Sequence, residues 1–195
     1  DFKALRIDTR VGEFSIHGKI DRVDTYDKKV AIIDYKTGSA EAKLKDVYYG
    51  NKIQLYVYLS VFLKNGYQPA GVFYLPISDG YRSKKERFAL QGQVENSPKT
   101  INALDKVFIE KALKSGEKVN SEIINLSASP NIDPDKAINN TKNMLDKKDF
   151  DTICTYVHNL MENAIDEICK GNIDKAPIKD ACKYCAYTNH CSQDE

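Results

Sequence analysis

The sequence predicts an α/β (α+β) domain with a mixed central sheet flanked by helices, followed by C-terminal helices and a cysteine-bearing tail. Three observations support this. Short apolar and β-branched runs of strand length dominate the first part of the chain, apart from one long apolar helical segment. After Pro98 the apolar residues follow a helical period, and three of the five cysteines lie in the last 14 residues. We expect residues 1–175 to form one domain and residues 176–195 to form the tail.

Composition narrows the class of protein. Hydrophobic residues make up 42% and charged residues 29% of the 195, which is typical of a soluble globular domain. Neither a bilayer-spanning apolar run nor a signal peptide is present. The odd number of cysteines, with three in the last 14 residues, indicates a reducing compartment, so we expect a cytoplasmic protein. The net charge of +1 argues against a protein that coats nucleic acid and leaves room for local DNA contacts. Because the chain begins with Asp1, we expect a fragment of a longer protein.

The first part of the chain predicts three strands and a turn. Residues 14–23 are rich in β-formers, and residues 26–29 form a turn of Tyr, Asp and two Lys. Residues 30–33 are continuously apolar, as expected of a strand covered on both faces, and Gly38 with Ser39 ends it. Two further strands are expected at residues 71–77 and 87–94.

Helices are predicted from long segments with helical apolar spacing. Residues 51–64 are apolar almost all round, which indicates a buried helix between the strands. Two more segments are each followed closely by a glycine, a common helix end, at residues 99–114 and 150–170. Between them, residues 127–148 are polar and turn-prone, with a helix expected from about Pro134.

Two aspartates and a lysine form the candidate site. Side chains alternate across a strand, so Asp34 and Lys36 share a face and Tyr35 lies on the other. If the strand containing Asp21 pairs with the next strand through the short turn, Asp21 lies beside Asp34. Adjacent carboxylates repel each other unless a cation joins them, and Mg²⁺ prefers oxygen ligands. Lys36 would then orient a water and offset charge on a scissile phosphate, which is phosphodiester hydrolysis.

The surrounding motifs resemble the RecB-like branch of the PD-(D/E)XK nuclease superfamily. Residues 18–24 read GKIDRVD and residues 34–38 read DYKTG, and both match the motifs of that branch without a gap. Gln54 and Tyr58 match its Q-x-x-x-Y helix, one helical turn apart on a shared face. The alternative is that Gln54 and Tyr58 only satisfy each other or nearby backbone.

The resemblance implies a restriction-endonuclease-like core that hydrolyses DNA with Mg²⁺. It implies metal binding by Asp21, Asp34 and the main-chain carbonyl of Tyr35, with Lys36 as a catalytic residue. It also implies that the Q-x-x-x-Y residues are site residues that help to position the substrate or the lysine. The branch places another metal ligand on an upstream helix. His17 does not match that position, because it lies on the strand itself.

The tail has the spacing of a metal or cluster site. Cys182, Cys185 and Cys191 follow a C-x₂-C-x₅-C pattern, which suits iron–sulfur or zinc ligation. The resemblance implies a [4Fe–4S] cluster whose last three ligands are this trio and whose first cysteine lies upstream of the chain. Cys154 and Cys169 are alternatives for the fourth ligand, although we expect both to be buried thiols.

A basic stretch supplies the candidate DNA contacts outside the motifs. Arg82, Lys84, Lys85 and Arg87 lie within seven residues and are suited to phosphate binding. A solvated hairpin edge that discourages aggregation is an equally good interpretation.

Within the branch, the chain is most similar to the C-terminal nuclease domains of the B subunits of AddAB-type helicase–nucleases. That similarity implies DNA and an AddA-like helicase–nuclease subunit as partners, and a role in resecting double-strand breaks for recombination. A stand-alone iron–sulfur exonuclease, of the type used in CRISPR adaptation or phage recombination, shares the same motifs. An inactive module that binds DNA ends or a subunit is the alternative from another class.

Overall fold

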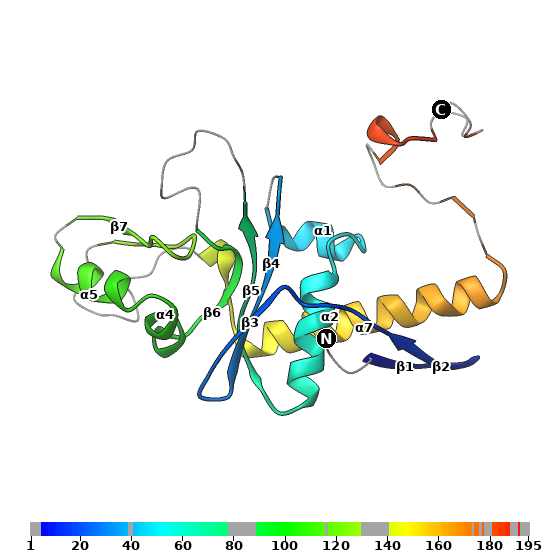
Figure 1. Cartoon of the computed structure of the whole chain (residues 1–195), viewed down its shortest axis with the longest axis horizontal. Helices are drawn as coiled ribbons and strands as arrows, with labels where there is room; N and C mark the ends of the chain where they lie inside the picture. Colours follow the sequence, from blue (N-terminus) through cyan, green and yellow to red (C-terminus); the bar gives the residue numbers. More distant parts are fainter. Residues whose placement is uncertain are drawn as a thin grey trace.

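The computed structural model describes residues 5–38, 41–77, 89–115, 117–129, 141–172, 174–175, 177, 181–187 and 191. Its centre is a five-stranded mixed sheet in the order β3-β4-β5-β6-β9 (Figure 1). The pairings alternate between antiparallel and parallel along that order, from β3–β4 through β6–β9. The strands are β3 (Arg22–Tyr26), β4 (Lys29–Lys36), β5 (Gln68–Pro76), β6 (Gln91–Glu95) and β9 (Met144–Leu145). The expected mixed sheet is confirmed.

The β3–β4 hairpin is closed by the predicted turn. Asp27 and Lys28 both have positive φ, at 48° and 59°, which matches the twist of a two-residue hairpin turn. β4 lies between β3 and β5, and its residues 30–34 are all buried. The continuous apolar run therefore forms a strand covered on both faces, as expected.

A helical crossover joins the parallel strands β4 and β5. It consists of α1 (Leu44–Tyr48) and α2 (Gln54–Lys64), so the helix expected at residues 51–64 begins three residues later. α2 packs on β4 and β5 together with the long helix α7 (Lys147–Cys169). Stacking of the Tyr48 and Tyr156 rings, with centroids 5.9 Å apart, holds α1 against α7. Together they build one face of the molecule.

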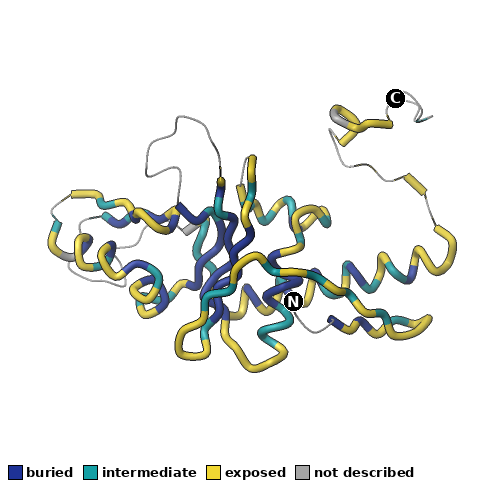
Figure 2. Tube along the Cα trace, viewed as in Figure 1, coloured by how far each residue is buried: buried dark blue, intermediate teal, exposed yellow. Residues whose placement is uncertain are grey.

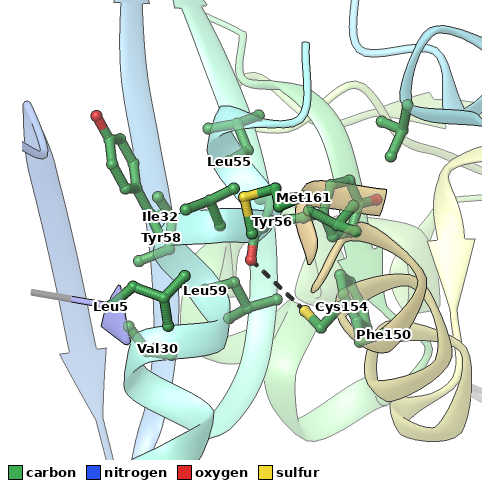
Figure 3. Close-up of a cluster of buried hydrophobic side chains, with 14 of the residues drawn as sticks. Leu5, Val30, Ile32, Leu55, Tyr56, Tyr58, Leu59, Phe150, Cys154 and Met161 are labelled. Carbon is green, nitrogen blue, oxygen red and sulfur yellow. Dashed lines mark hydrogen bonds between the residues drawn. The ribbon is translucent and has the colours of Figure 1, made fainter. Parts of the chain in front are cut away.

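Two apolar cores lie on opposite faces of the sheet, and both appear as dark blue segments at the centre of Figure 2. The first joins alternate residues of β4 and β5 to α2 and α7. It includes Ile32, Leu59 and Phe150, as Figure 3 shows. The second core joins the other face to α4 (Pro98–Leu104) and α5 (Lys106–Lys114). This alternation explains why β4 is apolar at every position from Val30 to Ile33.

Two expected elements are divided. Residues 14–23 are not one strand, because β2 (Gly12–Ile16) pairs with β1 (Leu5–Thr9), whereas β3 begins at Arg22 and belongs to the central sheet. Residues 99–114 form two helices, because Asp105 separates α4 from α5. Its carboxylate accepts a hydrogen bond from the Phe108 N–H, which starts a new helix.

The remaining elements are short. β7 (Val119–Asn120) pairs with β8 (Ser127–Ala128), and two 3₁₀ turns are η1 (Thr141–Asn143) and η2 (Ala181–Tyr184). The helix expected from Pro134 lies outside the described residues. Among the helices that are described, none is both long enough and apolar enough to cross a membrane.

Candidate active site

The predicted site lies at the C-terminal end of β4, where the central strand leaves the core. Asp34 is only 4% exposed, and it follows directly after the apolar run. Lys36 lies on the same face, and its Nζ is 2.5 Å from Asp34 Oδ2. The lysine side chain is 38% exposed, so its ammonium group bridges the buried carboxylate and solvent.

Asp21 lies beside this pair, at the start of β3. The antiparallel register pairs Arg22 with Ile33, and extending it by one residue places Asp21 opposite Asp34. The Tyr35 backbone N–H donates a 2.9 Å hydrogen bond to Asp21 Oδ2. The expected meeting of Asp21, Asp34 and Lys36 is therefore present.

One oxygen of this site lacks a hydrogen bond. Asp34 Oδ2 is buried and accepts none from any residue that the structure describes, because the Lys36 contact is a charge contact without hydrogen-bond direction. A buried carboxylate oxygen without a hydrogen bond costs free energy unless a cation compensates it. This oxygen, the exposed carboxylate of Asp21 and the main-chain oxygens at the end of β4 form an oxygen-only donor set.

That donor set fits Mg²⁺, which is commonly held by one or two carboxylates, water and substrate phosphate. The N–H and C=O of one strand residue point to the same edge, so the Tyr35 carbonyl lies on the Asp21 side. Across the described part of the chain, no three His, Cys, Asp or Glu side chains are grouped to hold a metal ion. The protein side chains would therefore supply a partial shell, with water completing it.

The Q-x-x-x-Y residues form a hydrogen-bonded relay. Gln54 Nε2 donates to the Tyr58 hydroxyl at 2.8 Å, and that hydroxyl donates to the Lys19 carbonyl oxygen at 2.9 Å. Gln54 is exposed at the start of α2, whereas Tyr58 is buried. These two bonds lead to the segment before Asp21 and do not involve Lys36. Both contacts are those of the alternative interpretation, in which Gln54 and Tyr58 satisfy each other and nearby backbone.

Tyr74 is a site residue that the sequence motifs did not indicate. It pairs with Asp34 across the parallel β4–β5 ladder, and Lys36 Nζ lies 5.1 Å from the centre of its ring. Burial, with the nearby charges of Asp34 and Asp46, raises the pKa of Tyr74 to about 12. Its signal in the sequence is weak, because only the strand register shows which β5 residue reaches Asp34.

The opposite face of the same hairpin carries a second charged pair. Arg22 donates two hydrogen bonds to the Asp24 carboxylate, at 2.9 and 2.7 Å. These bonds are the main cause that raises the pKa of Arg22 above its ordinary value. The ring of Tyr35 belongs to this face and is exposed. Arg22 and Asp24 therefore lie on the face of the hairpin opposite Asp21 and Asp34 and are not part of the candidate site.

Other predicted residues are less informative. The basic stretch with Arg82, Lys84, Lys85 and Arg87 lies outside the described residues. His17 is exposed, in the connection after β2. The expectation that His17 lies on the strand of Asp21 is wrong, because β2 ends at Ile16 and β3 begins only at Arg22.

Cys182 lies in the 3₁₀ turn η2 and Cys185 directly follows it, and this turn is drawn apart from the sheet in Figure 1. The Cys185 N–H donates to the Cys182 carbonyl at 3.2 Å, and the Tyr187 N–H donates to Cys185 Sγ at 3.4 Å. Cys182 and Cys185 are exposed, Cys191 is partly exposed, and none of the five cysteines is in a disulfide. Backbone N–H groups that point at a sulfur stabilise a thiolate, so the turn fits a metal or cluster ligand.

The two remaining cysteines differ from each other. Cys154 is buried as expected, and its Sγ contacts the Tyr56 carbonyl oxygen at 3.7 Å (Figure 3). Burial, with a smaller effect of Asp151, raises the pKa of this thiol to about 12. The expectation that Cys169 is buried is wrong. It is exposed, because it lies at the last turn of α7, beyond the part that packs on the sheet.

Comparison with known proteins gives a consistent result. Residues 1–192 match the PD-(D/E)XK nuclease superfamily. The whole chain is 33% identical to the B subunit of the ATP-dependent helicase/deoxyribonuclease of Alkaliphilus oremlandii and 31% identical to its counterpart of the same name in Clostridium kluyveri, in each case over 18% of the relative. A protein of the same name from Thermoanaerobacter is 31% identical over 92% of this chain and 17% of its own length.

The chain thus spans less than a fifth of the length of these curated relatives. The resemblance to nuclease domains of such B subunits is confirmed at the level of sequence similarity, and the mixed sheet agrees with the expected nuclease fold. This chain belongs to the PD-(D/E)XK nuclease superfamily.

Proposed function

We propose that this chain is a Mg²⁺-dependent deoxyribonuclease module that hydrolyses DNA phosphodiester bonds, as an exonuclease. The observation that carries the proposal is the juxtaposition of Asp21 with the buried Asp34–Lys36 pair at one edge of the sheet. Two carboxylates and one ammonium group at the end of a rigid, buried strand are suited to a divalent cation and a phosphate.

Each residue has a distinct role in this proposal. Asp21, Asp34 and the Tyr35 carbonyl would hold Mg²⁺, which supplies Lewis-acid activation of water and phosphate. Lys36 orients the attacking water and offsets the negative charge that develops on the phosphate. Tyr58, supported by Gln54, fixes the backbone at Lys19 and thereby the approach of Asp21. The basic residues Arg82, Lys84, Lys85 and Arg87 are proposed to contact the DNA backbone.

The experiment is cleavage of linear single- and double-stranded DNA by the complete natural protein with Mg²⁺. The comparison is with Lys36→Ala, and the matched control is Lys45→Ala, which removes an exposed lysine of α1. We expect Lys36→Ala to lower the rate by about 10²–10³-fold and Lys45→Ala to leave it unchanged. Calorimetry should show that Lys36→Ala still binds Mg²⁺, because the lysine competes with the cation for Asp34 Oδ2.

The outcomes separate the alternatives. Equal cleavage by the wild type and Lys36→Ala would overturn the assignment of the site. No cleavage by the folded, metal-loaded protein in the presence of its partner subunit would favour the inactive DNA-end or subunit-binding module. End-labelled substrates distinguish exonuclease from endonuclease action.

The tail is proposed to bind a [4Fe–4S] cluster through Cys182, Cys185 and Cys191. The turn geometry and exposed thiols support this, and a fourth ligand is required. Iron and sulfide content of the anaerobically reconstituted complete protein tests it, with stoichiometric zinc as the contrary result. Cys169→Ser tests whether the fourth ligand is the exposed Cys169 or a cysteine upstream of this chain, and the buried Cys154→Ser serves as its control.

The names of the relatives support a place in a larger machine. We propose that this module acts in the cytoplasm with an AddA-like helicase–nuclease subunit, in end resection at double-strand breaks. A motor that delivers the strand agrees with the near-neutral charge of the chain, which offers no strong attraction for DNA of its own. Co-purification of the complete protein with a helicase subunit, and ATP-dependent degradation of duplex ends, would distinguish this from the stand-alone exonuclease.

A further inference from the structure

Lys36 has two contacts at the site, one with Asp34 and one with the ring of Tyr74. A cation bound to Asp34 would weaken only the first of them. The Lys36 ammonium group lies against Asp34 Oδ2, which is the oxygen that the proposed function assigns to Mg²⁺. Once a divalent cation engages that oxygen, the attraction between Lys36 and Asp34 is largely cancelled. The flexible lysine side chain then needs another partner to stay over the site.

The aromatic ring of Tyr74 is that partner. Lys36 Nζ lies 5.1 Å from the ring centre, within the range of a cation–π interaction. Tyr74 is only 2% exposed and belongs to the first core, so its ring is held in place by packing. Tyr74 is paired with Asp34 in the ladder, and the metal-binding carboxylate and the ring therefore have a fixed separation.

Lys36 lies over the ring of Tyr74, whereas the ammonium group of Lys52 is paired with Asp46 at 3.1 Å. A divalent cation on Asp34 does not compete for the ring face.

We propose that Tyr74 is a positioning residue that holds the Lys36 ammonium group over the carboxylate edge, which is formed by Asp21 and Asp34 at the C-terminal end of β4, when a divalent cation occupies Asp34. Tyr74 acts through Lys36 and does not touch the substrate. The proposal rests on the proposed function, and it adds a residue that none of the recognised motifs contains.

The first test is kinetic, in the complete protein at saturating Mg²⁺. Tyr74→Leu should lower kcat about tenfold and leave the KM for DNA unchanged, whereas Tyr74→Phe retains the ring and should stay within about twofold of the wild type. Phe73→Leu is the matched control, because Phe73 is an aromatic neighbour on β5 that faces the other core. In a Lys36→Ala background, Tyr74→Leu should cause no further loss of kcat. A tenfold loss that persists there would show a merely structural role and overturn the proposal.

The second test is spectroscopic and does not depend on cleavage. In the 195-residue chain labelled with ¹³C-lysine, the side-chain protons of Lys36 should be shifted upfield by the ring current. Their signal is assigned by its loss in Lys36→Ala. The shift should persist with Mg²⁺ alone, remain in Tyr74→Phe and vanish in Tyr74→Leu, with circular dichroism confirming that each variant is folded.

The two tests separate the proposals. Loss of the upfield shift when Mg²⁺ is added would overturn the positioning role, whatever the activity. An upfield shift that persists in a protein with no nuclease activity would overturn the proposed function and support the placement of Lys36 by Tyr74.

Discussion

The carboxylate edge and the cysteine tail are both candidate sites for inorganic groups, but they are organised in opposite ways. At the carboxylate edge, Asp34 is buried, and its neighbours lie on the β3–β4 hairpin and on β5. In the tail, Cys182 and Cys185 are exposed and their recorded backbone contacts join residues only two or three positions apart. The first site is fixed by the protein core, and the second by a local turn.

This difference determines how much each site depends on its bound group for stability. Hydrophobic packing already assembles the carboxylate edge, so a bound cation would compensate charge there and would not be needed for folding. A turn of exposed thiols buries almost nothing, and a bound cluster would supply most of its stability. We therefore expect substitutions at the edge to affect chemistry and substitutions in the tail to affect local folding.

The largest effect is expected from Asp34→Asn. Removal of this proposed metal ligand should lower DNA cleavage by about 10³-fold or more. The melting temperature should change little, because the partly exposed Lys36 ammonium group can return to solvent when the charge of Asp34 is removed. Cleavage assays and calorimetric scans of the same preparation check both statements. Lower stability together with wild-type cleavage would break the comparison.

The next largest effect is expected in the tail. Cys185→Ser should abolish the iron content of the complete protein and increase its proteolysis after α7, while Asp21 and Asp34 remain assembled. The measurements are iron analysis, limited proteolysis and Mg²⁺ calorimetry. Cys154→Ser serves as the matched control, because this thiol is buried in the first core. Loss of Mg²⁺ binding in Cys185→Ser would show that the two regions depend on each other.

A smaller effect is expected at the relay beside Asp21. Tyr58→Phe removes the hydroxyl that joins Gln54 to the Lys19 carbonyl, which should destabilise the fold by about 1 kcal/mol. Urea unfolding measures this change. Mg²⁺ affinity should fall several-fold, because the segment before Asp21 is less restrained. If stability falls but Mg²⁺ affinity is unchanged, the relay supports the core and does not position Asp21.

The last effect is a pH dependence that belongs to the core alone and is absent below pH 9. The pKa of Cys154 is raised from 9.0 to about 12, so the folded protein keeps a proton that the unfolded chain releases. The stabilisation is complete below pH 9 and is lost as the pH rises towards 12, by at most about 1.4 kcal/mol per pH unit. Cys154→Val should flatten the alkaline decline in the free energy of unfolding. Identical slopes from pH 9 upward would contradict this burial effect.

Local patterns predicted the edge well because its key residues lie in one hairpin. The apolar run at residues 30–33 and the turn before it were enough to place Asp21 beside Asp34. The relay of Gln54 and Tyr58 followed from helical spacing and the family motif. These features depend on short separations along the chain, where periodicity and turn chemistry carry the information.

Features that depend on pairing between distant segments were not predictable in the same way. Tyr74 reaches Asp34 only through the parallel β4–β5 register, which no local pattern fixes. The break at Asp105 depends on a capping bond in a segment whose apolar spacing continues through it. Cys169 continues the helical pattern of α7, but the part of α7 that packs against the first core ends before Cys169.

The two-residue turn at Asp27 and Lys28 has a consequence for the order of folding. Because Asp21 and Asp34 are joined by this hairpin, they approach each other as soon as it closes, an event of microseconds. Pairing of β5 must wait for the crossover through α1 and α2, with its larger loop-closure entropy. The carboxylate pair is therefore expected to form early in folding, and the ring of Tyr74 joins it late.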